Sequence, residues 1–141
     1  MSERRDRPYT GANFLVSIGE GDGRAPADGF AEVIFPPFVT DRTREPGTVP
    51  DDLASRVLVL RRGVTGSLDL YKWWDEARRA PARATRTVTV QLLGEGHTGV
   101  VLTWRFLRAY PVSVSYSPLR AMDAAVLMES IELAFDTVEM S

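Results

Sequence analysis

Few residues of this chain could do chemistry, and those few lack the partners that a reaction needs. The segment "RRGVTG" (residues 61–66) precedes a predicted helix whose N-terminus could bind a phosphate. It lacks the Lys-Ser/Thr ending of a P-loop and the spacing of G-x-G-x-x-G. His97, at the tip of "GEGHTG", has no serine and carboxylate pattern nearby to orient it as a base. A sharp turn at Gly63 and Gly66 and a solvated loop histidine are the better interpretations of these segments.

Paired acids and aromatic residues give no stronger signal. Glu129 and Glu132 would point to opposite faces of a strand, which favours a solvated surface over an acid–base pair. We expect Trp74 and Trp104 to be buried on apolar faces. Trp73 and Trp74 are adjacent on a helix, so one of them is free to reach a neighbouring element or subunit. We identify no catalytic residues and expect that the protein is not an enzyme.

The composition excludes several classes of site. The chain has no cysteine and a single histidine, which rules out disulfides, thiolate metal sites, cysteine nucleophiles and a histidine metal cluster. The formal net charge of −2 does not indicate specific nucleic-acid binding. We find no secretory signal and no apolar run long enough to span a membrane. We therefore expect no cofactor, no metal and no membrane span.

The elements that would position any site are mostly strands. At 141 residues the chain is expected to form one domain, residues 1–141. Residues 21–29 are rich in glycine, proline and aspartate and are predicted to form a loop, and residues 94–99 a hairpin turn. Pro36 and Pro37 should end the second strand, and Pro111 favours a strand start or an edge. Alternation of apolar and polar residues predicts strands at 13–20, 30–38, 56–63, 85–93, 100–107 and 110–117.

One helix is predicted at residues 67–79. Leu70, Trp73, Trp74 and Ala77 recur at helical spacing and form one apolar stripe. Ser67 is the expected N-cap, basic residues occupy the last turn, and Pro81 prevents continuation.

The sequence does not assign a secondary structure to two further segments. Residues 119–140 have a helical composition, yet the stretch around residues 130–136 alternates with strand period, so both structures remain possible. Residues 40–55 are polar and aperiodic. A segment of this length is long for a connection in a compact domain and is typical of a functional loop.

Charge is distributed unevenly along the chain. Residues 56–86 carry eight Lys/Arg against three acids, and residues 121–141 carry five acids and no base. Opposite patches could join copies head to tail, in contacts that form rings or filaments. The alternative is two solvated surfaces that never meet.

The order of motifs resembles the contractile-tail tube proteins, which are the tail tube proteins of T4-like phages and the inner tube proteins of extracellular contractile injection systems. The resemblance covers nearly the whole chain. It rests on "YTGANFLVSI" (9–18), "GFAEV" (29–33), "LVLRRGVTGSLDLYKWW" (58–74), "RTVTVQLL" (86–93), "WRFLRAYPVSVSYSPLRA" (104–121) and "MESIELAF" (128–135).

This resemblance implies a β-barrel or sandwich of the tail-tube type with one flanking α-helix, and a strand in the acidic C-terminal segment. It implies hexameric rings stacked into a hollow tube inside a sheath, whose contraction drives the tube through a target envelope. The implied partners are other copies of the chain, the sheath protein, baseplate and cap proteins, and protein cargo in the lumen. The resemblance also implies that the protein is part of a phage-tail-like particle, which assembles in the bacterial cytoplasm and can be released from the cell.

The middle of the chain departs from the family. Members carry a tyrosine- and glycine-rich segment before the "RG" strand, whereas residues 38–55 are poor in both. The departure leaves a baseplate tube-initiator ring as an alternative to the main tube subunit. A monomeric β-barrel that binds a small ligand is the alternative of a different class.

Assembly surfaces are predicted at two sets of residues. We expect the uncharged polar strand faces to line a water-filled lumen, through Thr87, Thr89, Gln91, Ser113, Ser115 and Ser117. We expect residues 40–55 to reach a neighbouring ring or subunit. Changing Arg61 and Arg62 together to glutamate should weaken tube formation and leave the monomer folded. The candidates for contacts between subunits are Arg42, Arg44, Asp51, Asp52, Arg56, Arg61, Arg62, Glu129, Glu132, Asp136 and Glu139.

Overall fold

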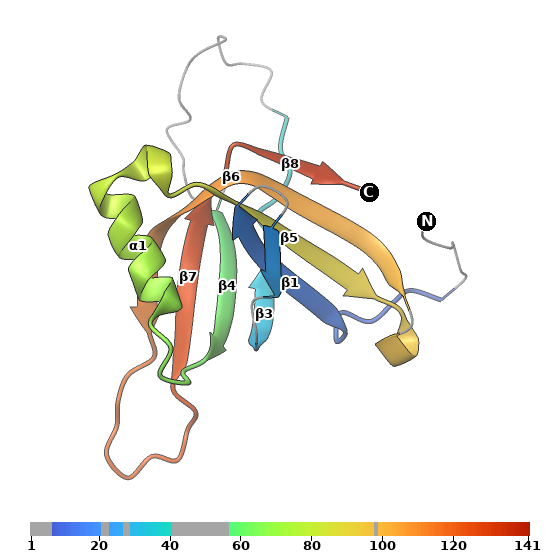
Figure 1. The fold of residues 1–141 in the computed structure, drawn as a ribbon. Helices are drawn as coiled ribbons and strands as arrows, with labels where there is room; N and C mark the ends of the chain where they lie inside the picture. The colour runs from blue at the N-terminus through green and yellow to red at the C-terminus, as the bar shows by residue number, and fades with distance from the viewer. Residues whose placement is uncertain (1–6, 21–22, 27–28, 41–56, 98) are drawn as a thin grey trace.

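The protein is a curved antiparallel sheet with one α-helix packed against it (Figure 1). The computed structural model describes residues 7–20, 23–26, 29–40, 57–97 and 99–141. The sheet with its single packed helix confirms the expected fold class, mainly β with a flanking helix. Within the described residues the elements are β1 (Phe14–Glu20), β2 (Gly23–Pro26), β3 (Phe30–Ile34), β4 (Val57–Gly63), α1 (Asp69–Arg79), η2 (Pro81–Arg83), β5 (Arg86–Leu93), η3 (Glu95–His97), β6 (Val100–Tyr116), β7 (Met128–Ala134) and β8 (Thr137–Met140).

The strands are ordered β2-β1-β5-β6-β7-β4-β3, and β8 adds to the edge of β6. Every pair is antiparallel. Among the described strands the order ends at β2 on one side and β3 on the other, and no hydrogen-bonded pairing between these two ends closes the curled sheet. The chain therefore forms an open barrel rather than a closed one.

The strand β6 differs most from the sequence prediction, which placed two strands at 100–107 and 110–117. The structure has one strand of 17 residues that pairs with β5 in its first half and with β7 in its second. It bends at Arg108, which has a left-handed backbone with φ of 53°. Pro111 lies inside the strand, next to a register shift toward Ser113, because a bulge tolerates a residue without an N–H group.

Two other segments were wrong or undecided in the sequence prediction. Part of the predicted loop at 21–29 is the short strand β2, which pairs with β1 from Ser17↔Pro26 to Glu20↔Gly23. The undecided C-terminus forms the two strands β7 and β8, as the family resemblance implied. Its alternating period outweighed its helical composition because one face of β7 is buried in the core.

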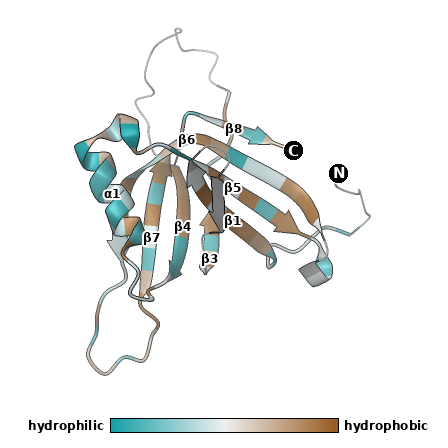
Figure 2. Cartoon of the chain, viewed as in Figure 1, coloured by the Kyte–Doolittle hydropathy of each residue, from teal (hydrophilic) through white to brown (hydrophobic). Residues whose placement is uncertain are grey.

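The core lies between the two halves of the curved sheet and α1. Alternate residues of β4, β5 and β7 point into it, including Leu58, Leu60, Val88, Ile131 and Leu133, each 0% exposed. Burying one such side chain stabilises the fold by roughly 1.5–3 kcal/mol. The alternation is visible as brown and teal bands along the strands in Figure 2.

The helix α1 begins two residues later than predicted. Leu68 occupies the N-cap position, and Ser67 Oγ instead accepts a hydrogen bond from the Asp69 N–H at 3.3 Å. Its buried residues are Leu70, Trp73 and Ala77, and it packs against β6. The helix ends at Arg79, directly before Ala80 and Pro81.

The two adjacent tryptophans take different roles from those predicted. Trp73 is the buried one, 1% exposed, and its Nε1 donates to the carbonyl of Ala84 at 2.6 Å. Trp74 is only half-buried and lies beside Tyr71, with the Arg78 guanidinium 5.3 Å from its ring centroid. Trp104 is also half-buried, in contact with Phe35 at 4.8 Å between ring centroids.

The corner between β4 and α1 confirms one of the two predicted turn glycines. Gly66 has φ of 96°, a conformation that an L side chain rarely adopts. Gly63 is the last residue of β4 and has no positive φ, and a Cβ there would be in ordinary contact with Val126 at 3.6 Å. The sharp turn therefore depends on Gly66.

Candidate functional site

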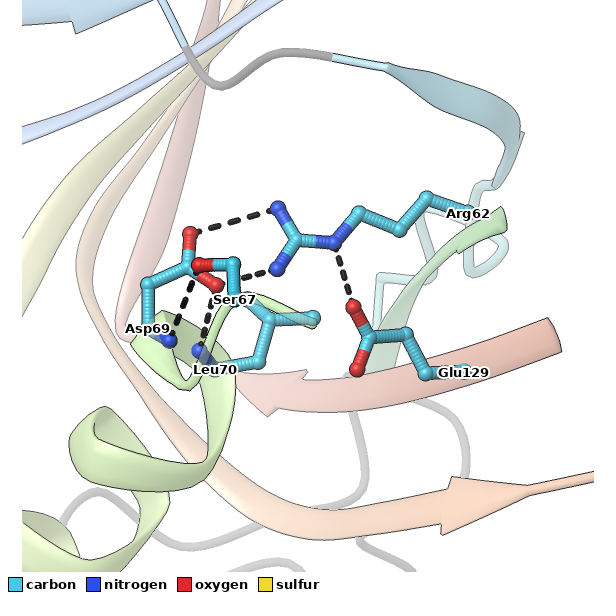
Figure 3. A network of polar contacts seen from close by, with 5 residues as sticks. All are labelled: Arg62, Ser67, Asp69, Leu70 and Glu129. Atoms are coloured by element: carbon cyan, nitrogen blue, oxygen red, sulfur yellow. Dashed lines mark hydrogen bonds and ion pairs between the residues drawn. The ribbon is translucent and has the colours of Figure 1, made fainter. Parts of the chain in front are cut away.

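An ion-pair network joins β4, β7 and the first residue of α1, with Arg62 and Glu129 buried and Asp69 exposed (Figure 3). Arg62 Nε donates to Glu129 Oε1 at 2.6 Å, and its Nη1 and Nη2 donate to the two carboxylate oxygens of Asp69, with 3.2 Å between Nη1 and Oδ2. Arg62 is 5% and Glu129 3% exposed. The Phe30 ring lies 5.3 Å from the guanidinium carbon. The network fixes the start of the helix to the sheet.

The charges of this network are stabilised by one another. Burial disfavours the carboxylate of Asp69, but hydrogen bonds from Arg62 and Ser67 outweigh it and hold the Asp69 pKa below its usual range. Burial likewise disfavours the guanidinium of Arg62, but bonds to Asp69 and Glu129 raise its pKa above the usual value. Both pKa shifts favour the charged forms of Asp69 and Arg62.

The helix N-terminus already holds an anion of this chain. Asp69 Oδ1 accepts a hydrogen bond from the Leu70 N–H at 2.9 Å, in the first turn of α1. In the preceding corner, the Val64 N–H donates to the Leu127 carbonyl at 2.9 Å. The segment 61–66 therefore works as a corner, as predicted, and its neighbouring helix terminus is neutralised by Asp69.

The predicted contact residues fall into different environments. Arg61 is exposed enough to meet a partner, although it bonds to Glu32 at 3.0 Å and to Ser130 Oγ at 3.1 Å. Asp136 pairs with Arg108 at the bend of β6. Glu132 and Glu139 are exposed, and neither has an ion pair within the described part of the chain. Five candidates lie outside the described residues, namely Arg42, Arg44, Asp51, Asp52 and Arg56, as does the segment 41–55.

Arg62 and Glu129 are the contact candidates that the structure removes from the surface. Each is the other's partner inside the protomer, so neither is presented to a second subunit. The expectation that the Arg61/Arg62 double change leaves the monomer folded is wrong for the same reason. Glutamate at position 62 would lie against the buried Glu129 and the exposed Asp69, and unpaired buried charge strongly destabilises a fold.

The opposite charge patches are also weaker than the sequence suggested. Several bases of the segment 56–86 are paired within the protomer, including Arg78 with Asp75 at 2.5 Å and Arg86 with Glu76 at 3.5 Å. Together with the Arg62 network, these pairs leave less uncompensated charge for a second copy than the formal count indicates.

The predicted lumen residues do not all share one exposed face. Thr89 is 2% exposed and belongs to the interior of the protomer. Ser117 Oγ accepts a hydrogen bond from the Met128 N–H at 2.8 Å at the end of β6. Ser113 and Ser115 lie opposite Glu132 and Ser130 of β7, on the face that the core does not use. Thr87 and Gln91 are half-buried on β5.

The sequence analysis missed an apolar cleft and an exposed loop. The cleft, about 320 Å³, lies where the curled sheet is open and is lined by residues 9–11, by Phe35 and by residues of β1, β3, β5 and β6. The loop 117–127 joins β6 to β7 and carries exposed Leu119, Met122 and Val126. The only sequence signal of these three loop residues was that they are apolar and lie in a segment that could not be assigned to helix or strand.

Neither a membrane-spanning helix nor a metal-binding cluster is found among the described residues. The helix within them is too short to cross a bilayer. The same residues contain no group of three or more His, Cys, Asp or Glu side chains arranged to hold a metal ion. The His97 side chain lies outside the described part of the structure.

Residues 12–139 match the model of one protein family, described as the T4-like virus tail tube protein gp19. No curated protein matches the sequence significantly. The fold is shared by solved structures of extracellular contractile injection systems and of an Hcp protein.

A cryo-EM structure of the PVC sheath-tube complex, from an extracellular contractile injection system in its extended state, is similar at TM-score 0.69 and 22% identity over 96% of this chain and 93% of that one. The anti-feeding prophage (AFP) baseplate structure is similar at TM-score 0.68 and 22% identity over 97% of each chain. Hcp1 from Flavobacterium johnsoniae is similar at TM-score 0.55 and 16% identity over 90% of this chain and 94% of that one.

Proposed function

The chain belongs to the family of T4-like virus tail tube proteins, and from that premise we propose that its copies close into hexameric rings that stack into a hollow tube with a central channel. It is a structural tail tube protein and not an enzyme. The observation that carries the proposal is the family match, which spans residues 12–139 and therefore every strand and the helix except the last residue of β8.

The partners and location follow from the assemblies in which similar chains are found. Chains with this fold occur in a sheath-tube complex, in a baseplate and in a tube-terminating cap. We assign this chain the corresponding partners, which are a sheath protein, baseplate proteins and a cap, with protein cargo in the lumen. The particle would assemble in the bacterial cytoplasm and resemble a phage tail.

The channel wall is assigned to the polar face of β6 and β7. Ser113 and Ser115 project there beside Ser130 and Glu132, opposite the buried face of the same strands. Thr87 and Gln91 of β5 are assigned to the channel with them. Hydroxyl and amide groups suit a water-filled lumen because they bind water, and Glu132 adds a carboxylate to the same face. Thr89 and Ser117 are left out of this set for the reasons of burial and bonding given above.

The contacts between subunits are assigned to the groups that remain exposed. Arg61 and Glu139 are accessible on the protomer surface. Glu132 is left out of this set because it lies on the face assigned to the channel. The segment 40–55 is assigned to a neighbouring subunit or ring because its polar, aperiodic sequence suits no buried element. Edge strands β2 and β3 would be covered by neighbours, which removes exposed hydrogen-bonding edges.

The mass and shape of the purified full-length protein test this function. Light scattering after size exclusion should give a particle six times the protomer mass of 15.6 kDa, or larger stacks of it. Negative-stain images should show rings end-on and long tubes from the side. Single rings that never stack would instead identify a baseplate tube-initiator ring. A stable 15.6 kDa particle at high concentration would refute the proposal and favour a ligand-binding monomer.

A further inference from the structure

The cleft at the open side of the barrel is an apolar surface that none of the described residues fills. Phe14, Val33, Phe35, Leu92 and Trp104 form much of its wall, and its volume is about 320 Å³. That is at the lower limit of sites for small ligands, and it suits a few side chains better than a cofactor. Glu32 lies at the same cleft, with its side chain 47% exposed.

The loop 117–127 is an ordered projection that carries aliphatic side chains into solvent. It extends away from the sheets in Figure 1, and brown segments mark its apolar residues in Figure 2. Leu119 is 83%, Met122 106% and Val126 70% exposed. The loop is held by its own hydrogen bonds, from the Asp123 N–H to the Arg120 carbonyl at 3.3 Å and from the Ala125 N–H to Asp123 Oδ1 at 3.0 Å. A loop that is already ordered loses little entropy when it binds.

Met122 is the clearest sign that this loop has a partner. Its backbone is left-handed, with φ of 67°, which costs an L residue roughly 1–2 kcal/mol. Its side chain is fully exposed, so no burial within the protomer offsets that cost. Glycine would adopt the same backbone without that cost. A methionine here gains stability only if its side chain is buried elsewhere, and methionine adapts well to irregular apolar gaps.

The loop cannot fill the cleft of its own protomer. Trp104 in the cleft wall and Tyr116 at the base of the loop lie twelve residues apart on β6. That is up to about 40 Å of strand, at roughly 3.3 Å per residue. The two features share no residue, and the loop remains exposed. Any contact between them therefore joins two copies head to tail.

We propose that the tip of the loop 117–127, led by Met122, inserts into the cleft of a second copy of this chain. The contact rests on the proposed self-assembly and adds which surfaces meet. Charge supports the pairing, because Arg120 is exposed beside the apolar tip and Glu32 lines the cleft. Arg120 has no ion pair within the described residues, and Glu32 is only partly engaged by Arg61 at the surface. The apolar tip would supply the affinity and the charged pair the register.

An engineered cysteine pair tests this contact directly, because the natural chain has no cysteine. The variant Met122→Cys/Ala31→Cys places one thiol on the loop tip and one on the cleft wall. Oxidation of the assembled protein should link each copy to the next and give a ladder of covalent oligomers on a non-reducing gel. A ladder that ends at six copies places the contact within a ring. A longer ladder places it between rings, and both results support the proposal.

The matched control is Met122→Cys/Ala82→Cys, whose second thiol replaces an equally small and exposed alanine on η2. It should assemble and give no ladder. If the Met122→Cys/Ala31→Cys variant forms tubes and gives no ladder either, the proposal is overturned while the proposed function stands. If the wild-type protein forms no rings or tubes, the proposed function is overturned and this contact with it.

A second pair of variants gives an energetic test. Met122→Asp should raise the protein concentration needed for assembly roughly tenfold or more, because a carboxylate would be buried in an apolar cleft. Met122→Leu should assemble within about threefold of the wild type, since it keeps an aliphatic side chain of similar volume. Both should keep the melting temperature of the protomer, because the side chain is fully exposed there. Assembly of Met122→Asp at the wild-type concentration would overturn the proposal and leave the cleft to a small apolar ligand or a different protein.

Discussion

Arg62 and Glu129 face each other across β4 and β7, 67 residues apart in sequence, and share a 2.6 Å hydrogen bond inside the protein. The bond joins the strand before the helix to the acidic C-terminal segment. Because Arg62 also binds Asp69, one guanidinium connects three parts of the chain. The basic and acidic segments that suggested contacts between subunits thus meet, in part, within one protomer.

Removing either partner should destabilise the protomer, and the two losses should differ. Arg62→Met leaves Glu129 as an unpaired buried charge and should cost about 3–5 kcal/mol. Glu129→Leu should cost less, because Arg62 keeps its bonds to Asp69. The double variant should be more stable than Arg62→Met alone, since no charge is then left unpaired between the strands. Denaturant unfolding below the assembly concentration measures all three, and additive losses would contradict the pairing.

Charge reversal at Arg61 separates assembly from folding. Arg61→Glu should leave the unfolding free energy within about 0.5 kcal/mol of the wild type, because surface pairs contribute little. It should still weaken ring or tube formation if this arginine meets a neighbouring subunit. The matched change Arg62→Glu should instead unfold much of the protein. Sedimentation and circular dichroism distinguish the two effects, and normal tube yield from Arg61→Glu would remove this residue from the interface.

The charge of Asp69 should make the unfolding free energy of the protomer depend on pH in the acidic range. Its folded pKa lies below its unfolded value of about 3.9, so its contribution is fully present above that pH. The contribution is lost as the pH falls through the folded pKa. Asp69→Asn keeps an acceptor for the Leu70 N–H but removes the charge. It should lower the unfolding free energy by about 1 kcal/mol at pH 7, a small value because the pair is partly screened.

The comparison at low pH completes this prediction. As the pH falls below about 4, the difference between Asp69→Asn and the wild type should shrink, because the wild-type carboxyl is then becoming protonated. Thermal unfolding of both proteins from pH 7 to pH 3 measures the difference. A gap that stays constant over this range would show that the charge of Asp69 contributes nothing.

Two glycines in the same corner should respond differently to substitution. Gly66→Ala forces a side chain into φ of 96° and should cost about 1 kcal/mol or more. Gly63→Ala has no positive φ, and its Cβ meets Val126 at an ordinary 3.6 Å, so its cost should be smaller. Melting temperatures of the two variants check the difference. Equal losses would mean that the corner does not depend on the left-handed residue.

Periodicity predicted the strands that bury one face and failed where backbone detail decides. Leu58 and Leu60 alternate with partly exposed residues, and Val88 and Val90 alternate with polar ones; that pattern alone located β4 and β5. The strand β2 was missed because its glycine and proline content resembles a loop, and it is held by backbone pairing with β1. The continuity of β6 depends on the left-handed Arg108 and on a bulge at Pro111, neither of which a pattern of side chains records.

The Arg62–Glu129 pair had a sequence signal that went unused. Arg62 continues the inward series of Leu58 and Leu60, and Glu129 begins the inward series of Ile131 and Leu133. Two opposite charges on core-facing positions should have suggested that they neutralise each other. What the sequence could not give is the register that sets them side by side. The cleft was equally out of reach, because four separate strands contribute to its wall.

The 17 residues of β6 belong to both halves of the barrel, with β5 bonded along one half and β7 along the other. The two halves are thus bridged by one unbroken peptide backbone. An endwise thrust on one half passes to the other through covalent bonds.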